Sequence, residues 1–248
     1  MKWLGLYLVL LPFGLAAEEI TVVHGAGHYP PYEMQVDGKL TGFHIELIKI
    51  ISKKLNLTVH FEVYPWKRAL SMVEHGDAHA VSFASINAKR EKYIIFTPGN
   101  ELSFAYSGLV VLANRKHEFH FNGKDLNNLS HYKFGSNLGF IFGDYYDKAK
   151  VNKQTFNSND QIYNVLRKKR IDIAVMNMNE FMHRQSLQDG STKELVMLDS
   201  KVALASFIGF SKHWKLQKLS QRFAKESMAF KKTQEFINLK KQFNIIEY

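Results

Sequence analysis

Short apolar segments alternate with amphipathic segments along the first third of the chain. The apolar segments at residues 20–24, 58–63 and 78–83 have the length of single strands. Between them, residues 44–55 and 66–76 carry apolar side chains at helical spacing, and the second of these segments ends at a glycine. Strands and helices that alternate at such short spacing favour right-handed βαβ units and a parallel sheet.

The second half of the chain repeats this construction. Residues 132–136 and 171–175 are predicted strands, and residues 160–169 are a predicted helix between them. The helix end, tight turn and small-residue strand of residues 74–81 recur in the segment that ends at residue 175. The pattern therefore predicts two lobes of similar construction.

Further apolar segments connect and complete these lobes. A helix at residues 179–188 and a strand at residues 194–198 are expected to complete the second lobe. Residues 102–113 and 202–210 are apolar and are predicted to leave and re-enter the first lobe. The C-terminal residues 216–243 have helical spacing and are expected to pack on the first lobe.

The turn that follows the third predicted strand combines hydroxyl groups with a cation. Asn87 is predicted to be the N-cap of a helix that begins at Ala88. Because a helix N-terminus carries partial positive charge, Arg90 in the first turn is unfavourable unless an anion lies beside it. A bound carboxylate would accept charge-assisted hydrogen bonds from Arg90, with Ser82 and Ser85 completing its contacts. The alternative is that this turn is one more solvated charged segment.

Three loops are predicted to meet at one edge of the first sheet, because ligands of parallel sheets bind beyond the carboxyl ends of the strands. Each loop follows a predicted strand, and the three contain Tyr29, Trp66 and the Ser82–Ser85 segment. Tyr29 and Trp66 are candidates for a ligand pocket, with packing in the core as the alternative. Glu33 is either a hydrogen-bonded loop carboxylate or a ligand contact.

The first 17 residues have the order of a secretory signal peptide. Lys2 precedes the apolar residues 3–15, and Ala16-Ala17 supplies small residues for cleavage. No later segment reaches the roughly 20 apolar residues that a membrane span needs. The mature chain is therefore expected to be soluble and periplasmic in a Gram-negative cell, after cleavage near Ala17. The chain has no cysteine, which excludes a lipid-anchored cysteine and a disulfide framework.

The basic excess is spread along the chain. A formal net charge of +10 suits anionic ligands, but the basic residues form separate groups rather than one stripe, so no nucleic-acid partner is expected. His75 and His79 are four residues apart, but Gly76-Asp77 interrupts any helix between them, so no metal site is predicted. No dinucleotide, phosphate-loop or nucleophile-elbow motif is present, and no cofactor or catalytic residue is expected.

Five short motifs occur in a fixed order. They are Tyr29-Pro30-Pro31-Tyr32-Glu33, Asp37-Gly38-Lys39-Leu40-Thr41-Gly42-Phe43, Ser85 five residues before Arg90, Phe96-Thr97, and Arg170-Ile171-Asp172-Ile173-Ala174. With these motifs, nearly all of the mature chain resembles the family 3 extracellular solute-binding proteins, which deliver polar amino acids and related solutes to ABC importers. The resemblance implies an α/β, two-lobed periplasmic-binding-protein fold of type II, with two mixed sheets joined by two crossing strands.

The resemblance also implies which residues bind the ligand. Tyr29 matches the aromatic residue that stacks on the ligand, and Trp66 falls near a second pocket aromatic. Ser82, Ser85 and Arg90 match positions that bind the ligand's carboxylate and amine. The implied set of ligand-binding residues is Tyr29, Trp66, Ser82, Phe83, Ser85, Arg90, Gly139, Ile141 and Asn177.

Three residues depart from the family's pattern. Asn87 and Ile141 replace hydroxyl residues, so some carboxylate contacts are expected from backbone N–H groups. Asn177 stands where amino-acid binders usually present an aspartate to the α-ammonium group, and an unpaired ammonium in a closed cleft is costly. Glu180 could substitute if its loop turns inward. Otherwise the ligand is an unusual or modified amino acid, or a carboxylate without an ammonium group.

The expected organisation is a signal peptide at residues 1–17, lobe 1 at residues 18–111 and 203–248, and lobe 2 at residues 112–202. The resemblance implies a monomer that captures a small carboxylate-bearing solute, an amino acid or derivative, for the membrane subunits of an ABC importer. Two alternatives remain open. One is a periplasmic enzyme of the cyclohexadienyl or arogenate dehydratase type, and the other is a ligand sensor that docks on a membrane partner.

Overall fold

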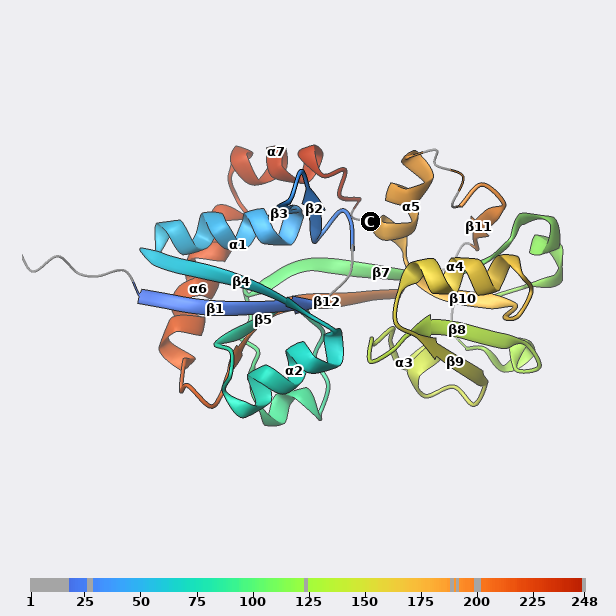
Figure 1. Ribbon diagram of the computed structural model, residues 1–248, viewed down its shortest axis with the longest axis horizontal. Helices are drawn as coiled ribbons and strands as arrows, with labels where there is room; N and C mark the ends of the chain where they lie inside the picture. Colours follow the sequence, from blue (N-terminus) through green and yellow to red (C-terminus); the bar gives the residue numbers. More distant parts are fainter. Residues whose placement is uncertain are drawn as a thin grey trace, which may run out of the picture.

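The computed structural model describes residues 18–25, 29–122, 125–187, 190, 192–198 and 202–246. The predicted signal peptide and residues 26–28 of the first predicted loop lie outside these described residues. Figure 1 shows two α/β halves arranged along the long axis of the molecule. We call the half that contains the first strands lobe 1 and the other half lobe 2.

One mixed sheet runs through both lobes. Its strands are β1 (Glu18–Gly25), β4 (Leu57–Tyr64), β5 (Ala80–Ala84), β6 (Ile94–Ile95), β7 (Glu101–Leu112), β8 (Lys133–Asn137), β9 (Asn152–Phe156), β10 (Ile173–Asn177), β11 (Leu195–Met197) and β12 (Val202–Ser211). The order is β4-β1-β5-β12-β7-β10-β8-β9, with β11 paired to β7 and β6 paired to β12. The predicted parallel pairs form between β1 and its neighbours β4 and β5, and between β8 and β10.

The two long strands β7 and β12 connect the lobes. They pair with each other in antiparallel orientation and run from one half to the other in Figure 1. β12 also pairs with β5 of lobe 1, whereas β7 also pairs with β10 of lobe 2. The structure thus has the predicted two-lobed α/β fold, and the two expected sheets are continuous because they share these crossing strands. The predicted lobe boundaries fall at the end of β7 and the start of β12, and the division of the chain into domains stays a prediction.

The helices follow the predicted periodicity closely. They are α1 (Phe43–Lys54), α2 (Trp66–His75), α3 (Asp144–Asp147), α4 (Asn159–Arg167), α5 (Met178–Ser186), α6 (Gln217–Phe230) and α7 (Gln234–Gln242), with the 3-10 helices η1 (Arg90–Lys92), η2 (Ala113–Glu118) and η3 (Asn127–Leu129). A separate hairpin of β2 (Met34–Val36) and β3 (Lys39–Thr41) precedes α1. Its turn residues Asp37 and Gly38 both have positive φ, as a two-residue hairpin turn requires.

The prediction of a helix that begins at Ala88 is wrong. Only the single 3-10 turn η1 forms there, and β6 begins at Ile94, so the chain leaves no length for an α-helix. Asn87 nevertheless acts as expected on the turn, because its Oδ1 accepts a hydrogen bond from the Arg90 N–H at 2.8 Å. The anion site inferred from an α-helix N-terminus therefore has to be judged from the side chains alone.

Each lobe has a core on both faces of the sheet. In lobe 1, one apolar cluster joins α1, α6 and α7 to the sheet, and a second joins α2 to the opposite face. In lobe 2, alternate residues of β7 point to opposite faces, so that Leu109 belongs to one buried cluster and Val110 to the other. The crossing strand thereby anchors lobe 2 on both of its faces.

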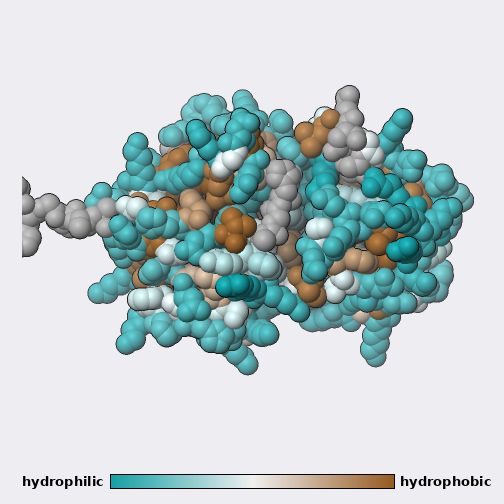
Figure 2. All heavy atoms as spheres, viewed as in Figure 1, coloured by the Kyte–Doolittle hydropathy of each residue, from teal (hydrophilic) through white to brown (hydrophobic). Residues whose placement is uncertain are grey.

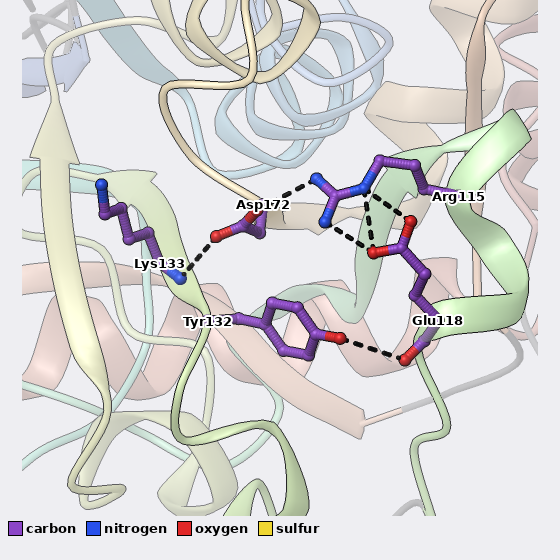
Figure 3. A network of polar contacts seen from close by, with 5 residues as sticks. All are labelled: Arg115, Glu118, Tyr132, Lys133 and Asp172. Atoms are coloured by element: carbon purple, nitrogen blue, oxygen red, sulfur yellow. Dashed lines mark hydrogen bonds and ion pairs between the residues drawn. The ribbon is translucent and has the colours of Figure 1, made fainter.

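A polar network holds one edge of lobe 2 together (Figure 3). Arg115 of η2 donates from Nη1 to Asp172 Oδ1 at 3.0 Å and from Nη2 to Glu118 Oε2 at 2.6 Å. The second carboxylate oxygen of Asp172 accepts the Lys133 N–H at 3.0 Å. Asp172 of the fifth sequence motif therefore ties η2 to the start of β8 and has a structural role.

Hydrophilic side chains cover most of the face of the molecule shown in Figure 2, with smaller hydrophobic groups between them. Within the part of the chain that the structure describes, no helix has both the length and the apolar character needed to cross a membrane.

Candidate functional site

Four aromatic side chains meet at the junction of the lobes. Tyr29, from the loop after β1, and Phe83, from β5, belong to lobe 1, and their ring centroids are 4.9 Å apart. Phe140, from the loop after β8 of lobe 2, lies 5.6 Å from Tyr29 and 5.9 Å from Trp66. The predicted convergence of the lobe 1 loops is therefore present, and lobe 2 inserts an aromatic ring among them.

A cavity of about 540 Å³ lies on one side of this aromatic cluster. Both lobes line it with aromatic, amide and charged side chains. The lining residues are Gly25, Tyr29, Glu33, Pro65, Trp66, Lys67, Phe83, Asn137, Leu138, Phe140, Asn157, Ser158, Asn159, Asp160 and Arg184. A volume of this size accommodates a small organic solute. We call this space the large cavity.

A second space of about 30 Å³ lies against the same four aromatic residues. Its lining contains most of the residues that the resemblance implied. The lining residues are Tyr29, Trp66, Phe83, Ser85, Arg90, Ala105, Ser107, Phe140, Ile141, Phe142, Asn177 and Ser206. We call this space the small cavity, and it has room for about two water-sized groups.

Arg90 lies at the junction between the lobes and is only 4% exposed. Its Nη1 donates to the Ser85 carbonyl at 2.8 Å, and its Nη2 donates to the Gly139 carbonyl of lobe 2 at 3.0 Å. The guanidinium also lies over the ring of Trp66, 5.4 Å from its centroid. Among the described residues no carboxylate forms an ion pair with it, and burial lowers the pKa of Arg90 to about 10. A buried cation satisfied by neutral carbonyls is a favourable partner for an anion.

Gly139 accepts hydrogen bonds from both predicted lobe 1 side chains. The Trp66 indole Nε1 donates to the same carbonyl at 3.0 Å as the Arg90 guanidinium does. Gly139 has a φ of +78°, and a Cβ at this position would lie 3.3 Å from Trp66 Cδ1. A glycine is therefore required here by both the backbone conformation and the close approach of the ring.

The structure does not place Ser82 in the site as predicted. Ser82 is fully buried, lines neither cavity, and donates its hydroxyl hydrogen bond to Glu33 Oε1. The other oxygen of Glu33 lies 3.5 Å from His24 Nδ1. Ser82 faces the opposite side of β5 from the small cavity because successive side chains of a strand alternate between faces.

Glu33 is a buried carboxylate that reaches the large cavity. Burial alone raises the pKa of Glu33, but the neighbouring His24 and His44 rings and the Ser82 hydroxyl outweigh it, and the pKa lies below its ordinary value. Glu33 is therefore ionised at neutral pH although it is only 3% exposed. The interpretation of Glu33 as a hydrogen-bonded loop carboxylate is confirmed, and a contact between Glu33 and a ligand stays a prediction.

Glu180 does not take the role of a free carboxylate. It is fully buried, forms an ion pair with Arg184, and accepts a hydrogen bond from the Tyr163 hydroxyl at 2.8 Å. Burial raises the pKa of Glu180, and the charge of Arg184 opposes this rise. Its N–H donates at 3.1 Å to Asn177 Oδ1, so that Asn177 is the side-chain N-cap of α5.

The comparison with protein families matches residues 21–241 to the model of the bacterial extracellular solute-binding proteins, family 3. The chain belongs to this family. The comparison with curated proteins gave no match.

Solved structures with the family's fold are numerous. A histidine kinase sensor domain with similarity to periplasmic binding proteins is 21% identical with a TM-score of 0.75, over 92% of this chain and 96% of that one. An ancestral arginine-binding protein bound to arginine is 20% identical with a TM-score of 0.73, over 92% and 99%. An ancestral amino acid-binding protein, a precursor of cyclohexadienyl dehydratase, is 19% identical with a TM-score of 0.73, over 91% and 95%. These likenesses show the fold.

Sequence reasoning missed several cavity residues of this family 3 member. Phe140 lies between two residues that were predicted, and its aromatic character in a loop after a strand was the available signal. Asn159, Asp160 and Arg184 sit on helices α4 and α5, where polar residues usually face solvent. No periodicity separates a polar residue that lines a cavity from one on the outer surface.

Proposed function

We propose that this chain is a periplasmic solute-binding protein that holds a small carboxylate-bearing solute between its lobes and delivers it to an ABC importer. In this proposal the leader at residues 1–17 is removed near Ala17 and the mature protein acts as a monomer. The proposed ligand contacts are Tyr29, Trp66, Phe83, Ser85, Arg90, Gly139, Ile141 and Asn177.

The environment of Arg90 is the observation that carries this proposal. A guanidinium at the lobe junction, bonded to backbone carbonyls of both lobes, has a position from which a bound carboxylate would contact both lobes at once. A ligand that contacts both lobes stabilises their closed arrangement over an open one. The aromatic walls of the adjacent large cavity would hold the rest of the solute.

Calorimetric titration with L-amino acids and small carboxylates tests the proposal. We expect saturable one-to-one binding of at least one compound. Arg90→Ala should weaken that binding about tenfold to a hundredfold, because hydrogen bonds to charged groups contribute roughly 1.5–3 kcal/mol. Arg222→Ala is the matched control, since Arg222 is half exposed and lines neither cavity. Equal affinity of the wild type and Arg90→Ala would contradict the proposal.

A second candidate is an elimination reaction of the dehydratase type. Glu33 supports it, because a buried, ionised carboxylate at the wall of the large cavity is suited to proton transfer. The ancestral precursor of cyclohexadienyl dehydratase has the same fold. Chromatography of the titrated mixtures distinguishes the two functions, since an enzyme would consume the compound and Glu33→Gln would abolish its loss.

A further inference from the structure

The small cavity contains two buried polar groups that have no hydrogen-bond partner within the described part of the chain. Its described lining residues include the cation Arg90 and no acidic residue. Ser206 is 1% exposed, and its hydroxyl has no hydrogen-bond partner among the described residues. Asn177 is 4% exposed, and its Nδ2 likewise has none. Buried polar groups are almost always hydrogen-bonded, so these groups indicate a binding site for something outside the chain.

The orientation of the Asn177 amide decides which chemistry the small cavity favours. Its Oδ1 accepts the Glu180 N–H at the start of α5, which leaves the NH₂ group for the cavity. An NH₂ group donates hydrogen bonds and cannot accept them. Asn177 therefore adds a donor beside the guanidinium, and both groups are suited to the oxygens of an anion.

An α-ammonium group would find no carboxylate among the described lining residues of the small cavity, and only weaker hydroxyl acceptors. The Gly139 carbonyl already accepts from Trp66 and Arg90, which uses both of its lone pairs. The Ser85 carbonyl accepts from Arg90 as well. In an amino acid only one carbon separates the ammonium from the carboxylate, so a carboxylate bound at Arg90 would bring its ammonium against these same donors.

We propose that the small cavity binds the carboxylate of an acid that has no α-ammonium group, through Arg90, the Asn177 NH₂ group and the Ser206 hydroxyl. The inference rests on the proposed function and names the class of its solute. The four shared aromatic residues connect this anion site to the large cavity, where the body of the acid lies.

Matched pairs of acids that differ only in the α-amino group test this inference. The probes are L-phenylalanine with 3-phenylpropanoate, L-leucine with 4-methylpentanoate, and L-glutamate with glutarate, each titrated calorimetrically. For the pair that binds, we expect the acid without the amino group to bind at least about tenfold more tightly, since a buried ammonium without a carboxylate partner beside a guanidinium is penalised.

Asn177→Asp is the decisive variant. Aspartate keeps the oxygen that caps α5 and replaces the NH₂ group with an acceptor, so the fold is preserved while the preference should invert toward the amino acid. Asn152→Asp, at an exposed position of β9, adds the same charge to lobe 2 and should leave the preference unchanged. Ser206→Ala should weaken both members of a pair equally.

The outcomes separate this inference from the proposed function. If the amino acids bind more tightly to the wild type, or if Asn177→Asp leaves the preference unchanged, the inference is overturned while solute binding stands. If no member of any pair binds, the proposed capture of small carboxylates and this inference both fail.

Discussion

Phe83 has a backbone conformation that is rare for its residue type. Its φ is +60°, in the left-handed region, where a bulky side chain is unfavourable by roughly 1–3 kcal/mol. The ring contacts Tyr29 at 4.9 Å and His44 at 5.0 Å and reaches Phe140 of lobe 2. The strained conformation turns Phe83 toward the lobe junction while its neighbour Ser82 remains bonded to Glu33. Such residues concentrate where a structure has to present a side chain to a ligand.

The buried His44 should make the protein sensitive to acid. His44 is fully buried, stacks on Tyr32, and shares a 2.8 Å hydrogen bond with Ser103. Burial lowers the pKa of His44 from 6.5 to about 3, against the opposing charge of Glu33. Because the folded-state pKa is depressed, the contribution of His44 to stability is complete above pH 6.5 and is lost as the pH falls toward 3.

Urea unfolding at a series of pH values measures this effect. Between pH 6.5 and 3, the unfolding free energy of the wild type should fall more steeply than that of His44→Gln, by up to about 1.4 kcal/mol per pH unit. Glutamine keeps a hydrogen-bonding group for Ser103 but cannot titrate. Parallel pH dependences for the two proteins would show that His44 does not bind a proton on unfolding.

At the scale of single elements, the capped N-terminus of α4 forms part of the wall of the large cavity. Its N-cap Ser158 accepts the Gln161 N–H at 3.3 Å, and the next residues, Asn159 and Asp160, line the cavity. Asp160 in the first turn also pairs with Arg184 of α5 at 2.6 Å. The start of α4 therefore determines where several cavity side chains lie.

Ser158→Ala should lower the unfolding free energy by about 1 kcal/mol, within the range of roughly 0.5–2 for a lost N-cap. Ser158→Asn is the control, because asparagine caps helices as well as serine does. Urea unfolding of the three proteins measures the difference. Equal midpoints for the alanine and asparagine variants would mean that the side-chain cap does not stabilise α4.

At the scale of the whole molecule, side chains from both lobes hold the junction closed. Trp66 and Arg90 bond to the Gly139 carbonyl, and Asn179 of α5 donates to the Tyr32 hydroxyl at 2.8 Å. In the C-terminal segment, the Ile246 N–H donates a hydrogen bond to the Asn179 side-chain Oδ1 at 3.0 Å. Apart from the crossing strands, few polar contacts join the lobes in the part of the chain that the structure describes, so the closed arrangement should respond to the loss of one of them.

Trp66→Phe should shift the molecule toward an open arrangement, because it removes one hydrogen bond between the lobes and keeps an aromatic ring. The chain has no cysteine, so Glu74→Cys and Lys150→Cys, both exposed and in different lobes, accept a fluorescent donor and acceptor. We expect lower transfer efficiency in Trp66→Phe than in the labelled wild type.

Trp214→Phe is the control for this measurement. The Trp214 indole donates to the Gly76 carbonyl at 2.9 Å, a bond of the same type that lies within lobe 1. Its loss should leave the transfer efficiency unchanged. A decrease of the same size in both variants would show that the two lobes are not held by the Trp66 bond.

Most of the predicted elements lie within a few residues of their expected places, whereas β6, β9 and α3 were not predicted. Helix α1 and strand β7 lie almost where periodicity placed them, because a core face imposes its spacing on the local sequence. The helix expected at Ala88 was wrong because its local signals, an N-cap and a charged turn, also suit a 3-10 turn whose length depends on the strand that follows. Local signals mark where a helix starts better than how far it continues.

The candidate site was predicted in part. Tyr29, Trp66, Phe83, Ser85, Arg90, Ile141 and Asn177 all line one or both cavities. Gly139 contributes its carbonyl, whereas Ser82 is turned toward Glu33. Which of the two serines, Ser82 or Ser85, faces a cavity depends on how side chains alternate between the faces of the strand. It also depends on hydrogen-bond partners that lie far away in the sequence.

Apolar periodicity, turn residues and motif order were sufficient for the two-lobed architecture, since each acts over a few residues or one helical turn. The chemistry of the small cavity depended on contacts between distant segments. The Asn177 amide is oriented by the Glu180 N–H, and the Gly139 carbonyl is shared by two side chains of the other lobe. An asparagine in a sequence can donate or accept, and only the partner that binds one end of its amide determines what the other end offers a ligand.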